Sequence, residues 1–246
     1  MSIRYLHLKP KLSSVGCYEA HLLVVKNEIY ASIAKICVES FLFFNPGSKV
    51  VLHVDSRTIR ASNNALKKSI ARNQVSIVQI DSDSLPWQDS KLALILSIGD
   101  AKKFFMDADL KWNGPLTDLN GITLFVNEFA FEENTFYEPL VKQDWFAEYP
   151  NSSMKNTSFF YWGGYVPSIN DKVLIKDLMA RIKEITSDER NSQEFNLSTG
   201  RISEQIALSL LVEKVDSCVY FLKESDGFKD GTFVESSYFG ATGASF

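Results

Sequence analysis

The chain has 246 residues, a size that suits one α/β domain or one domain with a small subdomain. Hydrophobic residues make up 45% of it, which is enough for a sizeable core. The 26 Lys and Arg residues are balanced by 30 Asp and Glu residues, giving a net charge of −4. This balance lacks the basic footprint of nucleic-acid-binding proteins, so we expect no nucleic-acid partner.

The sequence also favours a cytoplasmic location. No segment reaches the roughly 18 consecutive apolar residues that a membrane span needs, and we see no signal peptide at the start. The odd number of cysteines, without CxxC or Cys/His spacing, favours a reducing compartment over a disulfide framework or a zinc site. We therefore expect a cytoplasmic protein, either free or held peripherally at the inner face of a membrane.

The first half of the chain alternates strand-like and helix-like segments. Short apolar runs predict buried strands, and the stretches between them have helical spacing of apolar residues or a polar helical composition. The expected strands are 22–25, 50–54, 75–80 and 103–106, and the expected helices are 29–44, 57–72 and 91–98. This alternation indicates an α/β fold with a doubly wound, mostly parallel sheet and helices on both faces.

The pattern changes after Gly121. Here we expect strands at 122–126, 159–166 and 219–222, and helices near 171–184 and 202–213. The tail from Lys223 is rich in glycine but also contains aromatic residues, so we predict a loop or lid. We find no internal repeat and no linker, and therefore predict a single domain over residues 1–246.

Polar residues stand at the ends of three predicted strands. Asn27, Asp55 and Asp107 follow the first, second and fourth strands of the chain. In open α/β sheets, ligands bind beyond the carboxyl ends of the strands. These residues therefore predict a ligand site at one edge of the sheet.

The strongest motif is the segment 104–109, an apolar strand that ends in Asp107-Ala108-Asp109. Carboxylates that follow a strand in this way can hold Mg²⁺ or Mn²⁺ together with phosphate oxygens of a substrate. A D-x-D triplet alone is common by chance, and two solvated loop carboxylates are the alternative. The strand before it and its position after three strand-helix units favour the metal site.

Three segments carry a resemblance to a known family. Residues 91–93, 103–109 and 114–119 resemble the central block of GT-A glycosyltransferases and are most similar to family 8, the glycogenin and lipopolysaccharide galactosyltransferase group. The resemblance implies a GT-A type, Rossmann-like fold with a smaller acceptor-side region. It assigns about 20–125 to nucleotide-sugar binding and about 126–246 to the acceptor side and a C-terminal loop.

The resemblance also implies an activity. Such enzymes move a sugar from a nucleotide-diphosphate sugar, here most simply a UDP-sugar, to a glycan, a lipid-linked saccharide or another hydroxyl acceptor. Asp107 and Asp109 match the ligands of Mn²⁺ or Mg²⁺, and Asp107 is also expected to contact the sugar donor. Lys91 matches the basic residue near the diphosphate and the donor sugar, with an exposed helix lysine as the alternative.

The resemblance to the family also implies further donor-binding residues, assigned by their matching positions in this sequence. Val25 and Asn27 occupy the place that touches the nucleoside, and Asp55 matches a carboxylate that hydrogen-bonds the base or ribose. A helix cap at Asn27 and a turn at Asp55 are the alternatives. Gly163 and Gly164 resemble a small-residue strand that lets the sugar approach the backbone, although a β-bulge has the same signature.

Glu204 is the predicted catalytic residue. The segment Ser203-Glu204-Gln205 resembles an acidic segment beside the acceptor, where a carboxylate acts as a base or stabilises an oxocarbenium-like transition state. The alternative is an acidic residue that favours a helix N-terminus. The family's C-terminal histidine ligand has no counterpart here, because the chain's only histidines are His7, His21 and His53.

Competing interpretations fit the sequence less well. A dehalogenase-type phosphatase would place its D-x-D near the start of the fold, and a sugar-nucleotide pyrophosphorylase would need a glycine-rich loop after its first strand. A catalytically weak or inactive nucleotide-sugar or carbohydrate-binding protein of the same fold remains the main alternative to an enzyme.

Overall fold

The computed structural model describes most of the chain. The described residues are 17–81, 86–98, 102–112, 114–116, 122–150, 152–161, 167–214, 219–223 and 234–235. Gly163, Gly164 and nearly all of the predicted C-terminal lid lie outside these residues.

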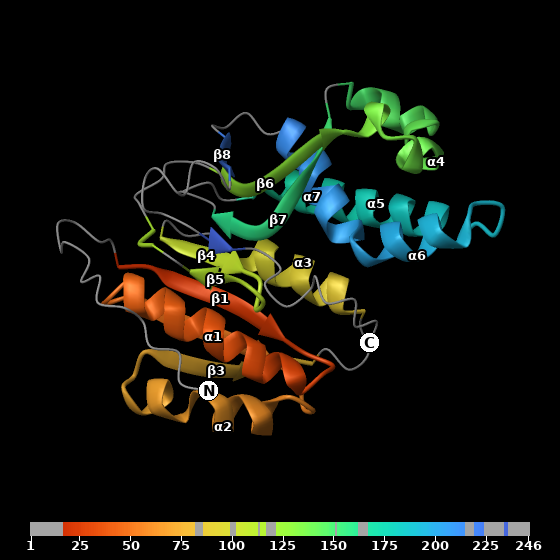
Figure 1. Ribbon diagram of the computed structural model, residues 1–246. Coiled ribbons are helices and arrows are strands. Elements are labelled where there is room, and N and C mark those ends of the chain that lie inside the picture. Colours follow the sequence, from red (N-terminus) through yellow and green to blue (C-terminus); the bar gives the residue numbers. More distant parts are fainter. Residues whose placement is uncertain are drawn as a thin grey trace.

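A seven-stranded sheet, in the order β3-β2-β1-β4-β7-β6-β8, forms the centre of the fold (Figure 1). Neighbouring strands are parallel except where β7 lies antiparallel to β4 and β6. The mostly parallel sheet is therefore confirmed. The strands are β1 (Glu19–Val24), β2 (Lys49–Val54), β3 (Val75–Gln79), β4 (Lys103–Met106), β6 (Ile122–Ala130), β7 (Ser153–Tyr161) and β8 (Val219–Lys223).

Helices cover both faces of this sheet, as expected. On one face lie α1 (Ile29–Phe44) and α2 (Ile59–Ala71), and on the other lie α3 (Trp87–Ser97), α5 (Ile169–Thr186), α6 (Gln193–Arg201) and α7 (Ser203–Lys214) (Figure 1).

Strand β4 shows how the two faces are built. Phe104 and Met106 pack into the core beneath α1 and α2, whereas Phe105 packs into the core formed with α3, α5 and α7. Successive strand side chains point to opposite faces, so a run of apolar residues serves both cores at once. This explains why an uninterrupted apolar run precedes Asp107.

Several boundaries differ from the predicted ones. Helix α3 begins at Trp87, directly after Pro86, which is the N-cap residue and has an extended backbone with φ −55° and ψ 145°. Strand β7 begins at Ser153 and is described to Tyr161, earlier than the predicted 159–166, because its first half is polar and gives no apolar signal. Helix α6 was not predicted, since it is short and mostly polar.

Two smaller features lie outside the main layers. Between β6 and β7 the chain forms the short helices η1 (Phe131–Glu133), η2 (Thr135–Tyr137), α4 (Glu138–Val141) and η3 (Asp144–Glu148). A second, two-stranded sheet pairs β5 (Lys111–Trp112) antiparallel with β9 (Val234–Glu235). The described part of the tail therefore returns to the segment that directly follows Asp107 and Asp109.

Candidate active site

The loop after β4 carries the two aspartates, and a hydrogen bond from helix α1 holds its backbone. β4 ends at Met106, so Asp107 is the first residue beyond the carboxyl end of the strand. The thiol of the buried Cys37 on α1 donates to the backbone carbonyl of Asp107, with Sγ and O 3.4 Å apart. The sequence places both carboxylates at this edge because the strand before them is fixed by its buried aromatic residues.

Lys91 connects three elements at this loop. Its ammonium lies 3.0 Å from Oδ1 and 3.1 Å from Oδ2 of Asp107, and 3.4 Å from Oε1 of Glu204. Lys91 comes from α3 and Glu204 from α7. The residue exposures are only 2% for Lys91 and 0% for Glu204, whereas the side chain of Asp107 is 21% exposed, so the network is buried at Lys91 and Glu204 and reaches solvent at Asp107. The alternative of an exposed helix lysine is thus wrong for Lys91.

The opposite charges in this network shift one another's pKa values towards the ionised forms. Burial by itself lowers the pKa of Lys91, but the neighbouring charges of Asp107 and Glu204 outweigh it, and the net effect raises the pKa. Burial raises the pKa of Glu204, and the positive charge of Lys91 opposes this effect only in part. The only ion pair of Glu204 with another described side chain is the one with Lys91, at 3.4 Å from Oε1. Glu204 therefore depends on Lys91 for its electrostatic compensation.

The negative charge of Asp109 is less well compensated by Lys91 than that of Asp107. Burial, followed by repulsion from Asp107, raises the pKa of Asp109 to about 6, and the more distant Lys91 opposes this only in part. Burial together with the negative charges of Asp109 and Asp107 also raises the pKa of Tyr30, in the first turn of α1. A cation bound between the carboxylates would relieve their repulsion.

The donor set fits a hard divalent cation that takes the rest of its ligands from a substrate. Mg²⁺ is commonly held by one or two carboxylates and by phosphate oxygens, rather than by a complete protein cage. Within the described ranges, no group of three or more His, Cys, Asp and Glu side chains is placed to hold a metal ion.

Asp55 shapes the neighbouring loop. It is fully buried, and its Oδ2 accepts a hydrogen bond from the backbone N–H of Lys26 at 2.7 Å. Its Oδ1 accepts from the backbone N–H and the hydroxyl of Thr58 at 2.9 and 2.8 Å. Burial acts to raise the pKa of Asp55, but these hydrogen bonds outweigh it and the pKa is lowered. The backbone of Lys26 is held at φ 69°, in the left-handed region.

The loop after β1 also contains Val25 and Asn27. Oδ1 of Asn27 accepts from the backbone N–H of Ile29 at 2.9 Å, so its side chain does help to begin α1, although the residue before the helix is Glu28. The predicted contacts of Val25, Asn27 and Asp55 with a nucleoside stay predictions.

The structure thus brings Lys91, Asp107, Asp109 and Glu204 into one cluster at the carboxyl edge of the sheet. The loop of Val25 and Asn27 follows the neighbouring strand. Tyr30 was missed from the sequence. Its position near the start of the helix after the first strand is the only signal that could have pointed to it.

Comparisons with solved structures define the class of fold. The chain has the fold of GT-A glycosyltransferases. It is similar to the galactosyltransferase LgtC in complex with donor and acceptor sugar analogs, with a TM-score of 0.56 and 11% sequence identity, over 82% of this chain and 72% of that one. An active-site mutant of LgtC gives a TM-score of 0.51 with the same identity and coverage.

Sequence comparisons give no further assignment. No protein-family model matches the chain, and no curated protein sequence matches it. Within the described residues, no helix combines the length and the apolar character required to cross a bilayer.

Proposed function

We propose that this protein is a metal-dependent glycosyltransferase of the hexosyltransferase type, which moves a sugar from a nucleotide-diphosphate sugar to a hydroxyl group of an acceptor. The observation that carries this proposal is the pair Asp107 and Asp109 at the carboxyl end of β4, with a buried lysine bound to Asp107, on a GT-A fold. A UDP-sugar is the favoured donor, and a glycan or lipid-linked saccharide is the favoured acceptor.

Asp107 and Asp109 would hold Mn²⁺ or Mg²⁺. When bound, the ion supplies positive charge that neutralises the leaving diphosphate. The raised pKa of Asp109 supports this assignment, because a carboxylate that lies beside a second one and is only partly compensated by Lys91 is a favourable ligand for a cation.

Lys91 would hold Asp107 in a fixed orientation. Both carboxylate oxygens of Asp107 lie within 3.1 Å of the ammonium, which restricts rotation of the side chain. A carboxylate that is oriented in advance loses less conformational freedom when the metal and donor bind. We retain the proposed contact of Lys91 with the donor, together with those of Val25, Asn27, Asp55, Gly163 and Gly164.

Glu204 has two proposed roles that differ in what it touches. A catalytic base must reach the acceptor hydroxyl, whereas in this structure Glu204 is fully buried behind Lys91. Burial therefore favours a positioning role, in which Glu204 holds Lys91 against Asp107. The catalytic role requires that Glu204 become accessible when substrates bind.

The C-terminal tail would close over the donor. The pairing of β9 with β5 brings Val234–Glu235 beside the segment that follows the two aspartates. A tail anchored at this point could cover the diphosphate and exclude water that would otherwise hydrolyse the donor.

A thermal-shift panel tests the donor class. UDP-, GDP-, CMP- and dTDP-sugars are each added with Mn²⁺ or with EDTA, since a ligand that binds the folded state raises its apparent stability. We expect a shift for at least one nucleotide sugar, largest with Mn²⁺ and absent in Asp109→Ala. A shift that is unchanged by EDTA and by the substitution would overturn the proposed metal site.

A further inference from the structure

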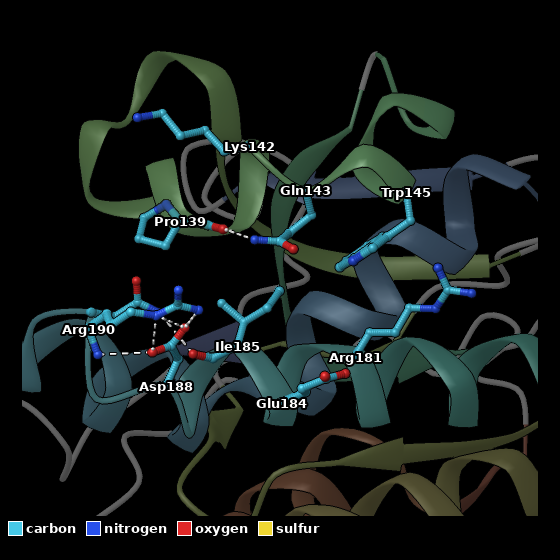
Figure 2. A pocket seen from close by; sticks show the side chains of 10 residues that line it. Pro139, Lys142, Gln143, Trp145, Arg181, Glu184, Ile185, Asp188 and Arg190 are labelled. Atoms are coloured by element: carbon cyan, nitrogen blue, oxygen red, sulfur yellow. Dashed lines mark hydrogen bonds and ion pairs between the residues drawn. The ribbon is translucent and has the colours of Figure 1, made fainter.

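A second concave site lies away from the aspartate loop. It is a pocket of about 710 Å³ between the α4–η3 segment and the carboxyl end of α5 with the turn that follows it (Figure 2). This volume is within the range of about 300–1,000 Å³ that small-molecule sites occupy. The proposed transfer reaction uses none of its lining residues.

The wall on the η3 side is aromatic. Trp145 is half-buried, and its indole ring meets Phe146 and Tyr149 at centroid distances of 5.9 and 6.4 Å. The guanidinium of Arg181 lies 5.6 Å from the indole centroid. These contacts fix the ring, so that its exposed part is a rigid apolar surface in the pocket wall (Figure 2).

The cations around the pocket already have anionic partners. Lys142 pairs with Glu138, Arg181 with Asp177 at 2.7 Å, and Arg190 with Asp188 at 2.6 Å. The pairing is strong enough at Asp188 to lower its pKa to about 2. An anionic ligand would have to compete with these carboxylates, so a phosphate or sulfate group is disfavoured.

The remaining polar groups of the pocket are two side-chain amides, each with an acceptor oxygen and a second N–H donor, and one carboxylate acceptor. Gln143 donates its amide N–H to the carbonyl of Pro139 at 2.9 Å, and Asn191 donates to the carbonyl of Ile185 at 2.9 Å. These bonds orient both amides, whose oxygens remain as acceptors. The exposed carboxylate of Glu184 adds a third acceptor to the lining.

A rigid aromatic surface beside several oriented acceptors suits a ligand with an apolar ring face and many hydroxyl donors. We propose that this pocket binds a neutral saccharide, with hydroxyl groups donating to Gln143, Glu184 and Asn191 and a pyranose ring packing on Trp145. This site is distinct from the aspartate loop and needs no nucleotide or metal.

The helix that lines the pocket is tied by one ion pair to the helix that carries Lys91. Lys183, beside Glu184 on α5, binds both carboxylate oxygens of Asp89 at 2.6 Å, and Asp89 lies on α3 close to Lys91. We assign the saccharide as a distal part of the acceptor glycan, and this assignment alone rests on the proposed transferase function. Binding of the saccharide does not depend on that function.

The test is saccharide binding in EDTA and without nucleotide. Isothermal titration and saturation-transfer NMR are run with maltotetraose, cellotetraose, lacto-N-tetraose and a sulfated heparin tetrasaccharide. We expect at least one neutral tetrasaccharide to bind, with affinity reduced about tenfold (about 1.4 kcal/mol) in Trp145→Ala, which loses the ring contact, and about fivefold (about 1 kcal/mol) in Glu184→Ala, which loses one hydrogen-bond acceptor.

Two controls keep the result interpretable. Glu184→Ala changes an exposed helix residue and leaves the aromatic packing intact, so it tests the pocket even if Trp145→Ala unfolds. Trp87→Ala removes another partly exposed tryptophan and should not change the affinity. The proposal is overturned if no neutral tetrasaccharide binds at millimolar concentration, if only the sulfated one binds, or if Glu184→Ala binds as tightly as the unmodified chain. A negative result here leaves nucleotide-sugar binding, which is measured separately, unaffected.

Discussion

Replacing Lys91 with methionine removes the positive charge that joins Asp107 and Glu204. The ammonium lies within 3.1 Å of both oxygens of Asp107 and 3.4 Å from Glu204, in a site where the lysine is only 2% exposed. Methionine has a similar volume and fills the space beside Phe105. The main consequence of the substitution is therefore electrostatic rather than a loss of packing.

The expected loss in the free energy of unfolding follows from the carboxylates that Lys91→Met leaves without a partner. Removing one partner of a buried ion pair typically destabilises a protein by about 3–5 kcal/mol, because the other charge is left buried without compensation. Glu204 is fully buried, whereas the side chain of Asp107 keeps 21% of its surface exposed and can recover some hydration. We therefore expect Lys91→Met to lower the free energy of unfolding by about 3 kcal/mol.

Urea denaturation of four proteins measures this effect and its cause. These are the unmodified chain, Lys91→Met, Glu204→Gln and the double variant. Glu204→Gln should change stability by less than about 1 kcal/mol, and the double variant should recover about 1–2 kcal/mol of the loss in Lys91→Met, because the amide no longer carries a buried charge. A loss below about 1 kcal/mol in Lys91→Met, or strictly additive effects, would refute the buried network.

Three further predictions concern other parts of the molecule. Glu204→Gln should lower kcat with little change in donor affinity if Glu204 acts in the chemical step or positions the groups that do; an unchanged kcat in steady-state assays would reduce it to a helix-terminus residue. His53, stacked on His21, has its pKa lowered to about 4, first by burial and then by His21, below an unfolded value of about 6.5. The unfolded chain therefore takes up this proton first as the pH falls from 6.5 to 4, and stability is lost across that window, by about 1–2 kcal/mol after allowance for partial solvent access. His53→Gln should lack this loss in urea titrations at pH 7 and 4.5, and identical pH dependence in both proteins would contradict it. Finally, nucleotide with Mn²⁺ should protect the segment from about Lys223 to Phe246 from limited proteolysis, and deletion of 236–246 should impair transfer more than folding; equal cleavage with and without ligand would rule out a lid.

Features that depend on neighbouring residues in the sequence could be predicted. The strand of Lys103–Met106, the carboxylates directly after it and the helices on both faces follow from local apolar patterns, because the sheet buries alternate residues of β4 in separate cores. The GT-A fold was predicted from the same block and is confirmed by the structural comparisons.

Features that depend on tertiary packing could not be predicted. The contact between Lys91 and Glu204 exists because α3 and α7 pack side by side, and nothing local to either residue indicates this. Similarly, the pairing of Val234–Glu235 with Lys111–Trp112 joins distant segments through backbone hydrogen bonds, which carry no sequence signature. Asp55 is a similar case, because the sequence cannot tell whether a carboxylate at a strand end binds a ligand or stabilises its own loop. In the structure, Asp55 accepts hydrogen bonds from Lys26 and Thr58 and so stabilises the loop.

The central claim is that Asp107 and Asp109 hold a metal ion that makes donor cleavage feasible. The most direct measurement is release of nucleoside diphosphate from the nucleotide sugar that gives the largest thermal shift, with Mn²⁺ or with EDTA, for the unmodified chain and Asp109→Ala. We predict slow release with Mn²⁺ that EDTA abolishes, and none in Asp109→Ala although circular dichroism shows that it is folded. Full turnover in EDTA or in Asp109→Ala would contradict the metal mechanism, and no turnover of a donor that binds with Mn²⁺ would identify a nucleotide-sugar-binding protein instead of an enzyme.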